Sequence, residues 1–130
     1  MDYDVIIVGG GPVGLITAKE IADAGYKVCV IEEHQEIGYP VQCSGLYSIS
    51  GLKALGLTLD ESIISNTIKG GRFYSPIGKE FTAYSNVERA RVVEKKLFDK
   101  HLAKRAARAG AEFKMKTGVR TPSINEGVRV

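Results

Sequence analysis

A glycine-rich turn directly after a β-branched run constrains this sequence more than any other feature. Residues 4–8 predict a strand buried on both faces, because residues 5–8 are a continuous β-branched run, and the run stops at three glycines, residues 9–11. Apolar residues then recur at helical spacing over residues 12–24, and residues 27–31 predict a second strand. Together these segments predict a βαβ unit, with two parallel strands joined by a crossover helix.

The glycine spacing inside this unit is that of a phosphate-binding turn. Gly9, Gly11 and Gly14 match the pattern G-x-G-x-x-G, where the first glycine permits a tight turn and the second lets the backbone approach a pyrophosphate. The third allows close packing of helix on strand. Pro12 and Val13 open the predicted helix, whose positive end attracts phosphate. We therefore expect all five residues to contact a dinucleotide.

An acidic residue ends the second predicted strand. Glu32 lies 18 residues beyond Gly14, close to the spacing at which a carboxylate meets the ribose hydroxyls of an adenine dinucleotide. A carboxylate repels a 2′-phosphate, so the turn predicts FAD or NAD rather than NADP. Glu33 is a further cofactor candidate, although strand alternation turns it to the opposite, solvated face. His34 is predicted to be a surface histidine.

The rest of the chain has weaker patterns. A loop with short helical turns is predicted over residues 34–51, followed by a hairpin, a second helix and a further strand. Their predicted bounds are strands at 68–75 and 80–84 with a turn at 75–78, a helix at 93–109 and a strand at 112–116, before a hairpin turn at 125–127. We expect three segments: 1–67 with the βαβ unit, 68–86 as a hairpin, and 87–130 returning to the first segment.

Composition excludes several classes of protein. The chain has 130 residues, 25% of them charged, and a net charge of only +3, so neither disorder nor a dedicated nucleic-acid surface is indicated. The acidic start and short apolar run match neither a signal peptide nor a membrane span, which predicts a cytoplasmic chain. Cys29 and Cys43 fit neither a disulfide scaffold nor a metal site, so reduced thiols and no metal are expected.

Two sets of motifs resemble known families. Residues 3–14, with Val-Ile-Glu closing the second strand, resemble the amino-terminus of the glutathione-reductase-type FAD-binding superfamily. Residues 36–45 (Glu-Ile-Gly-Tyr-Pro-Val-Gln-Cys-Ser-Gly), 98–103 and 109–111 are similar to the geranylgeranyl reductase family, which includes archaeal digeranylgeranylglycerophospholipid reductases. The resemblance implies an α/β, Rossmann-like FAD-binding domain with a parallel sheet and a partial antiparallel hairpin insertion. Residues 1–130 would be its amino-terminal part.

The resemblance also implies further cofactor contacts. Carried over by position, they fall on Cys43, Ser44 and the main chain of Leu46, and the backbone of Val119 would meet the adenine. Lys95 stands where family members have an arginine that touches the cofactor, and a lysine supplies charge there without a bidentate fork. The resemblance puts Cys43 near the flavin ring, and both a catalytic thiol and a loop residue without chemistry remain open for it.

Family members bind FAD and saturate isoprenoid double bonds, so the resemblance implies a prenyl-lipid substrate and an external electron donor, either NAD(P)H or ferredoxin-like. Another superfamily flavoenzyme, such as an aromatic monooxygenase or an electron-transfer flavoprotein dehydrogenase, and a non-catalytic dinucleotide-binding module remain alternatives. The 130 residues alone are expected to be inactive. Two side-chain sets could meet lipid: aromatic residues on an apolar substrate wall (Phe73, Tyr74, Phe81 and Tyr84), and a mostly solvated basic helix face that could touch a membrane (Lys96, Lys100, Lys104, Arg105 and Arg108).

Overall fold

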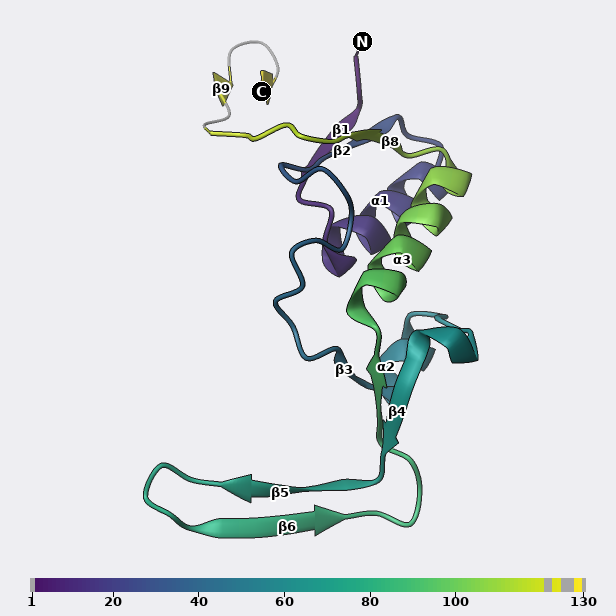
Figure 1. The fold of residues 1–130 in the computed structure, drawn as a ribbon. Helices are drawn as coiled ribbons and strands as arrows, with labels where there is room; N and C mark the ends of the chain where they lie inside the picture. The colour runs from purple at the N-terminus through teal and green to yellow at the C-terminus, as the bar shows by residue number, and fades with distance from the viewer. Residues whose placement is uncertain (1, 121–122, 125–127, 130) are drawn as a thin grey trace. The chain divides into compact units, whose positions relative to one another are not determined.

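A computed structural model describes residues 2–120, 123–124 and 128–129 of the chain (Figure 1). The chain divides into two compact units. The first unit comprises residues 1–41 and 96–130, and the second comprises residues 42–95. Each unit is described by itself.

The first unit contains the predicted βαβ arrangement. β1 (Val5–Val8) pairs in parallel with β2 (Val28–Ile31), and α1 (Pro12–Asp23) connects them. β8 (Glu112–Lys114) adds in parallel to the other side of β2, so the described strands follow the order β1-β2-β8. The parallel sheet expected from the sequence is confirmed, with its third strand coming from the far end of the chain.

Small residues on two helices cover one face of this sheet. Ala18 of α1 and Ala106 of α3 (Lys95–Ala109) are both fully buried in a cluster with Val28 and Val30 of β2. Figure 1 shows both helices on the same side of the sheet. Alanine at these positions lets each helix approach the sheet closely, and fully burying each valine contributes about 1.5–3 kcal/mol.

The expectation that the first strand is buried on both faces is wrong. Residues 5–7 are half-buried and Val8 is 63% exposed. β1 lies at the edge of the described sheet, whereas every residue of the central strand β2 is buried. Position in the sheet, which a run of β-branched residues does not reveal, decides this difference.

The second unit is built around a small antiparallel sheet. β7 (Ala90–Val93) lies between β3 (Leu46–Ser48) and β4 (Ile64–Ile68). The loop prediction for residues 34–51 is therefore wrong at residues 46–48. The second predicted helix, expected from residue 93, begins two residues later than predicted, at Lys95, because Val93 is the last residue of β7.

The second unit also contains two short helices and a small core of buried side chains. α2 (Ile49–Ala54) follows β3 directly, and the Ser48 hydroxyl caps it by accepting a hydrogen bond from the Gly51 N–H. A short 3-10 helix, η1 (Glu61–Ile63), precedes β4. The buried side chains are aliphatic: Leu52, Leu59, Ile63 and Val93.

The predicted hairpin is confirmed in the same unit. β5 (Gly70–Tyr74) pairs antiparallel with β6 (Glu80–Tyr84). The predicted turn closes with a hydrogen bond from the Gly78 N–H to the Ser75 carbonyl. Phe73 and Phe81 face each other across the ladder and stack with ring centroids 4.7 Å apart.

At the end of the chain, β9 (Ser123–Ile124) pairs antiparallel with β10 (Val128–Arg129), as a terminal hairpin requires. The turn predicted at residues 125–127 lies outside the described residues. No helix in the described part of the chain is long and apolar enough to cross a membrane.

Candidate functional site

The turn between β1 and α1 needs glycine at two positions for reasons internal to the fold. Gly9 has φ of +103°, a conformation that residues with a Cβ rarely adopt. A Cβ on Gly14 would lie 2.2 Å from the Gly9 carbonyl oxygen and 3.2 Å from Ile7 Cγ2. Gly9 therefore makes the turn, and Gly14 lets α1 pack onto the end of β1.

Gly11 has no such internal reason to be glycine. Its φ of −79° and ψ of 176° suit any residue, and a Cβ built there would meet nothing within 4 Å. Gly11 is the N-cap of α1, and no side chain caps this end. Pro12 takes the first helical position and Val13 is 81% exposed. No side chain in the described part of the chain therefore occupies the N–H groups of the first helical turn, and these groups are available to bind an anion.

Gly10, between the first two motif glycines, has a role that the sequence reasoning missed. A Cβ there would lie 2.3 Å from Ile37 Cδ1 and 3.2 Å from Glu32 Oε2. Ile37 is 9% exposed and belongs to the Glu-Ile-Gly motif of the loop after β2. The run of three consecutive glycines was the available signal, because a Cβ at Gly10 would force the Ile37 side chain to shift.

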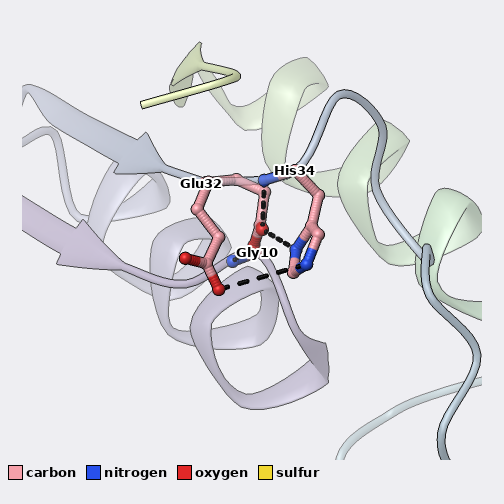
Figure 2. Close-up of polar contacts among 4 residues, drawn as sticks. Gly10, Glu32 and His34 are labelled. Carbon is pink, nitrogen blue, oxygen red and sulfur yellow. Dashed lines mark hydrogen bonds and ion pairs between the residues drawn. The ribbon is translucent and has the colours of Figure 1, made fainter. Parts of the chain in front are cut away.

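Glu32, directly after β2, is bonded to the glycine turn (Figure 2). Its Oε2 accepts a hydrogen bond of 2.7 Å from the Gly10 N–H. Its Oε1 accepts from the His34 N–H at 2.9 Å and contacts His34 Nδ1 at 2.6 Å. The Glu32 side chain is 12% exposed. The predicted ribose-binding carboxylate and the predicted phosphate-binding turn are thus one hydrogen-bonded assembly.

These contacts also set the ionisation of Glu32. Partial burial raises the pKa of the carboxyl, but hydrogen bonds from the His34 N–H, the Gly10 N–H and the His34 ring outweigh burial and leave the pKa below its ordinary value. Glu32 is therefore a carboxylate at neutral pH. An ionised carboxylate only accepts hydrogen bonds, which suits it to the hydroxyls of a ribose.

His34 differs from the expectation of a surface histidine. Its side chain is 40% exposed, yet the ring is paired with Glu32. The Glu33 side chain is 72% exposed, and its Oε1 lies 4.0 Å from His34 Nε2. The i, i+2 spacing of Glu32 and His34 was the only sequence signal for their contact, and such spacing in an extended segment is too common to be specific.

The backbone around Glu32 is held by the last residue of β8 and by the segment that follows β8. The Glu32 N–H donates to the Lys114 carbonyl, and the Glu32 carbonyl accepts from the Thr117 N–H, both at 2.9 Å. The Lys116 N–H donates to the His34 carbonyl at 3.0 Å. Val119 follows this segment in the first unit. The position of the acidic residue therefore depends on chain far from it in sequence.

The flavin-loop candidates lie in the second unit. Cys43 is exposed, and its Sγ accepts from the Gly45 N–H at 3.5 Å. Gly45 has φ of +72°, and its carbonyl accepts from the Val93 N–H at 2.9 Å. Leu46, the first residue of β3, continues this pairing because it lies opposite Val92 of β7. The loop carrying Cys43 and Ser44 is thereby fixed against β7. Lys95, the remaining candidate, is the first residue of α3 and the last residue of this unit.

Part of the predicted solvated basic face is engaged in ion pairs. Lys96 Nζ lies 2.6 Å from Glu36 Oε1, and Lys100 Nζ lies 3.0 Å from Glu36 Oε2. Hydrogen bonds from Lys96 and Lys100 lower the pKa of Glu36. These pairs fasten the loop after β2 to the first turns of α3. In the described part of the chain, no group of three or more metal-ligating side chains gathers.

Comparison with known proteins identifies the family of this chain. The sequence pattern of the FAD binding domain family matches residues 2–129. The digeranylgeranylglycerophospholipid reductase of Methanocaldococcus jannaschii is 44% identical over 115 residues, which are 88% of this chain and 29% of that protein. The corresponding reductase of Methanosarcina acetivorans is 42% identical over 118 residues, again 88% of this chain and 29% of the relative.

Solved structures show the same fold. A geranylgeranyl bacteriochlorophyll reductase-like protein of Thermoplasma acidophilum has a TM-score of 0.87 and 39% identity, covering 97% of this chain and 33% of that one. The halogenase PltM, solved with FAD, has a TM-score of 0.73 at 21% identity and covers 97% of this chain and 30% of its own, which shows the fold alone. The chain therefore spans about a third of the length of these relatives. It belongs to the FAD-binding domain family.

Proposed function

We propose that this chain binds the ADP half of FAD with the β1–α1 turn and Glu32. In this proposal the first-turn N–H groups of α1 and the backbone at Gly11 hold the pyrophosphate, and the Glu32 carboxylate accepts from a ribose hydroxyl. The contacts extend over Gly9, Pro12, Val13 and Gly14 within the turn.

The observation that carries this proposal is the contrast among the motif glycines. The fold accounts for Gly9 through its positive φ and for Gly14 through a backbone contact, but a Cβ on Gly11 meets nothing. A phosphate group lying against the backbone at position 11 would explain why this residue is glycine. The uncapped helix start and the ionised Glu32 beside it fit the two ends of an ADP group.

The flavin half has a separate set of proposed contacts. We assign them to Cys43, Ser44 and the main chain of Leu46, with Lys95 supplying positive charge, and we assign the adenine contact to the backbone of Val119. The local hydrogen bonds support this assignment: the Val93 N–H of β7 donates to the Gly45 carbonyl, and the Gly45 N–H donates to Cys43 Sγ, so the loop is tied to the sheet beside Cys43. The proposal includes neither a catalytic thiol at Cys43 nor a contact from Glu33, whose side chain is 72% exposed.

For the complete protein we propose reduction of isoprenoid double bonds in prenyl lipids, with these residues as part of its FAD-binding domain. When bound, FAD supplies the redox chemistry, and the protein supplies position and electrostatics. Names of relatives at 42–44% identity support the substrate class. A groove of about 750 Å³ in the second unit, lined by Leu46, Ile68, Phe73 and Tyr84 among others, supports an apolar ligand.

The test uses protein expressed from the complete reading frame. A yellow preparation with flavin absorbance supports FAD binding, whereas a colourless protein that binds NAD supports a non-catalytic dinucleotide module. Chemically reduced protein is then incubated with a geranylgeranyl lipid, and mass spectrometry should show a pair of hydrogens gained at each reduced double bond. A yellow protein that leaves the lipid mass unchanged would remove the reductase proposal and keep the cofactor assignment. Replacing the chemical reductant with NAD(P)H or a ferredoxin identifies the donor.

A further inference from the structure

The Glu32 carboxylate has most of its acceptor positions filled before any ligand is considered. A carboxylate offers about four lone-pair positions, two on each oxygen. At Oε1, the His34 N–H and the His34 ring fill both positions, at 2.9 and 2.6 Å. At Oε2, the Gly10 N–H fills one position at 2.7 Å. One acceptor position, on Oε2, is left for a ribose hydroxyl.

The ring contact depends on the identity of residue 34, whereas the main-chain contacts do not. The His34 N–H belongs to the backbone, and the His34 carbonyl is fixed by the Lys116 N–H at 3.0 Å. Because the carboxylate can only accept, the proton in the ring contact lies on His34 Nδ1. Alanine at position 34 therefore removes one hydrogen bond from Oε1 and leaves the surrounding backbone bonds in place.

We propose that His34 is a positioning residue for the dinucleotide site. Its Nδ1–H saturates Oε1 of Glu32, stops the carboxylate from rotating, and presents Oε2 as the oxygen that binds the adenosine ribose. This inference rests on the proposed FAD binding and adds a residue to it. His34 acts through Glu32 and needs no contact of its own with the ligand.

The size of the effect follows from the freedom that Glu32 regains. Ordering a flexible side chain on binding costs enough to weaken a complex about 2- to 10-fold. His34→Ala should weaken FAD binding by that factor. His34→Asn places an amide Nδ2–H at the branch position of the imidazole Nδ1–H, so it should restore affinity to near that of the unsubstituted protein.

The experiment measures FAD affinity of deflavinated protein, expressed from the complete reading frame, by quenching of flavin fluorescence. The variants are H34A, H34N, E32A and the double variant E32A/H34A, with His101→Ala in α3 as the matched histidine control. We expect H34A to weaken binding, H34N to rescue it, and H34A to have no further effect when Glu32 is already alanine.

Three results would overturn the role of His34. Equal affinity of H34A and the unsubstituted protein would show that the ring is dispensable. An H34N variant as weak as H34A would show that hydrogen bonding at Nδ1 is not what matters. A full H34A effect in the E32A background would mean that His34 meets the ligand directly. Unsubstituted protein that takes up no FAD is a different result, because it removes the proposed function itself.

Discussion

Replacing Gly11 by alanine separates what the fold requires from what the ligand requires. The new Cβ would meet no atom within 4 Å, and the backbone at φ of −79° and ψ of 176° accepts alanine without strain. Alanine also restricts the unfolded chain, which stabilises a protein by about 0.4–1 kcal/mol at unstrained positions. We therefore expect Gly11→Ala to fold with an unchanged or slightly higher melting temperature when no FAD is bound.

The same methyl group should damage FAD binding. In the proposed site it occupies the space through which a pyrophosphate oxygen would reach the backbone, and a hydrogen bond to a charged group contributes about 1.5–3 kcal/mol. Losing one such bond raises Kd roughly 10- to 150-fold. Fluorescence titration of deflavinated protein measures this change, and circular dichroism during heating measures stability on the same sample.

Gly14→Ala is the matched control because it makes the same chemical change three residues later. Its Cβ would lie 2.2 Å from the Gly9 carbonyl oxygen, so backbone must move. Forcing extra volume into a packed site costs about 1–3 kcal/mol, so the melting temperature should fall by several degrees. If Gly11→Ala binds FAD normally, or loses stability as Gly14→Ala does, the division of roles between these glycines is wrong.

Three other residues give independent tests. The pKa of Glu32 is lowered in the fold, so its ionisation stabilises the protein above the ordinary pKa of 4.5, and this stabilisation is lost as pH falls through the lower folded value. Glu32→Gln should therefore make the free energy of unfolding depend less steeply on pH in acid. An unchanged pH dependence would contradict the lowered pKa of Glu32. Cys43 is exposed whereas Cys29 is 1% exposed, so a thiol reagent should label Cys43 quickly in the native protein, and Cys43→Ser should abolish that fast phase. A hydrogen bond to Glu112 raises the pKa of Tyr3 to about 12, so the contribution of this bond to stability is present below pH 10 and is lost as pH rises toward 12. Tyr3→Phe should remove the phenolate transition at the highest pH in an absorbance titration. If that transition persists in the variant, it belongs to another tyrosine.

The first 32 residues could be predicted well because their information is local. A β-branched run, a glycine turn and a helical stripe of apolar residues follow one another without interruption, and each has its own local sequence pattern. The β5–β6 hairpin was predictable for the same reason, since Pro76 and Gly78 mark its turn between two short β-rich runs.

The sheet of the second unit could not be predicted, because its strands depend on partners far along the chain. β3 has only three residues, and Leu46 becomes part of a strand by pairing with Val92. β7 runs almost directly into α3, so its two valines look like the start of the helix pattern. Strand formation in such short segments is decided by tertiary pairing rather than by local preference.

Sequence reasoning predicted the glycine turn and the carboxylate of the candidate site but missed the residues that contact them. Gly11 and Glu32 stand at the spacings typical of phosphate-binding and ribose-binding residues, and those spacings are visible in sequence. Gly10, His34 and Ile37 act on other side chains, and no fixed spacing marks such contacts. Their roles follow only from the way the loop after β2 closes over the turn.

Because the backbone of Glu32 is bonded to Lys114 and Thr117, we expect the proposed cofactor site to form only after these distant residues have folded onto it. During synthesis the glycine turn and Glu32 leave the ribosome long before the segment that anchors them. A nascent chain that ends before β8 has the whole motif but lacks the two backbone partners of its acidic residue. FAD retention by this protein therefore reports that both ends of the first unit have come together, and a peptide containing only the motif is a poor substitute for the domain.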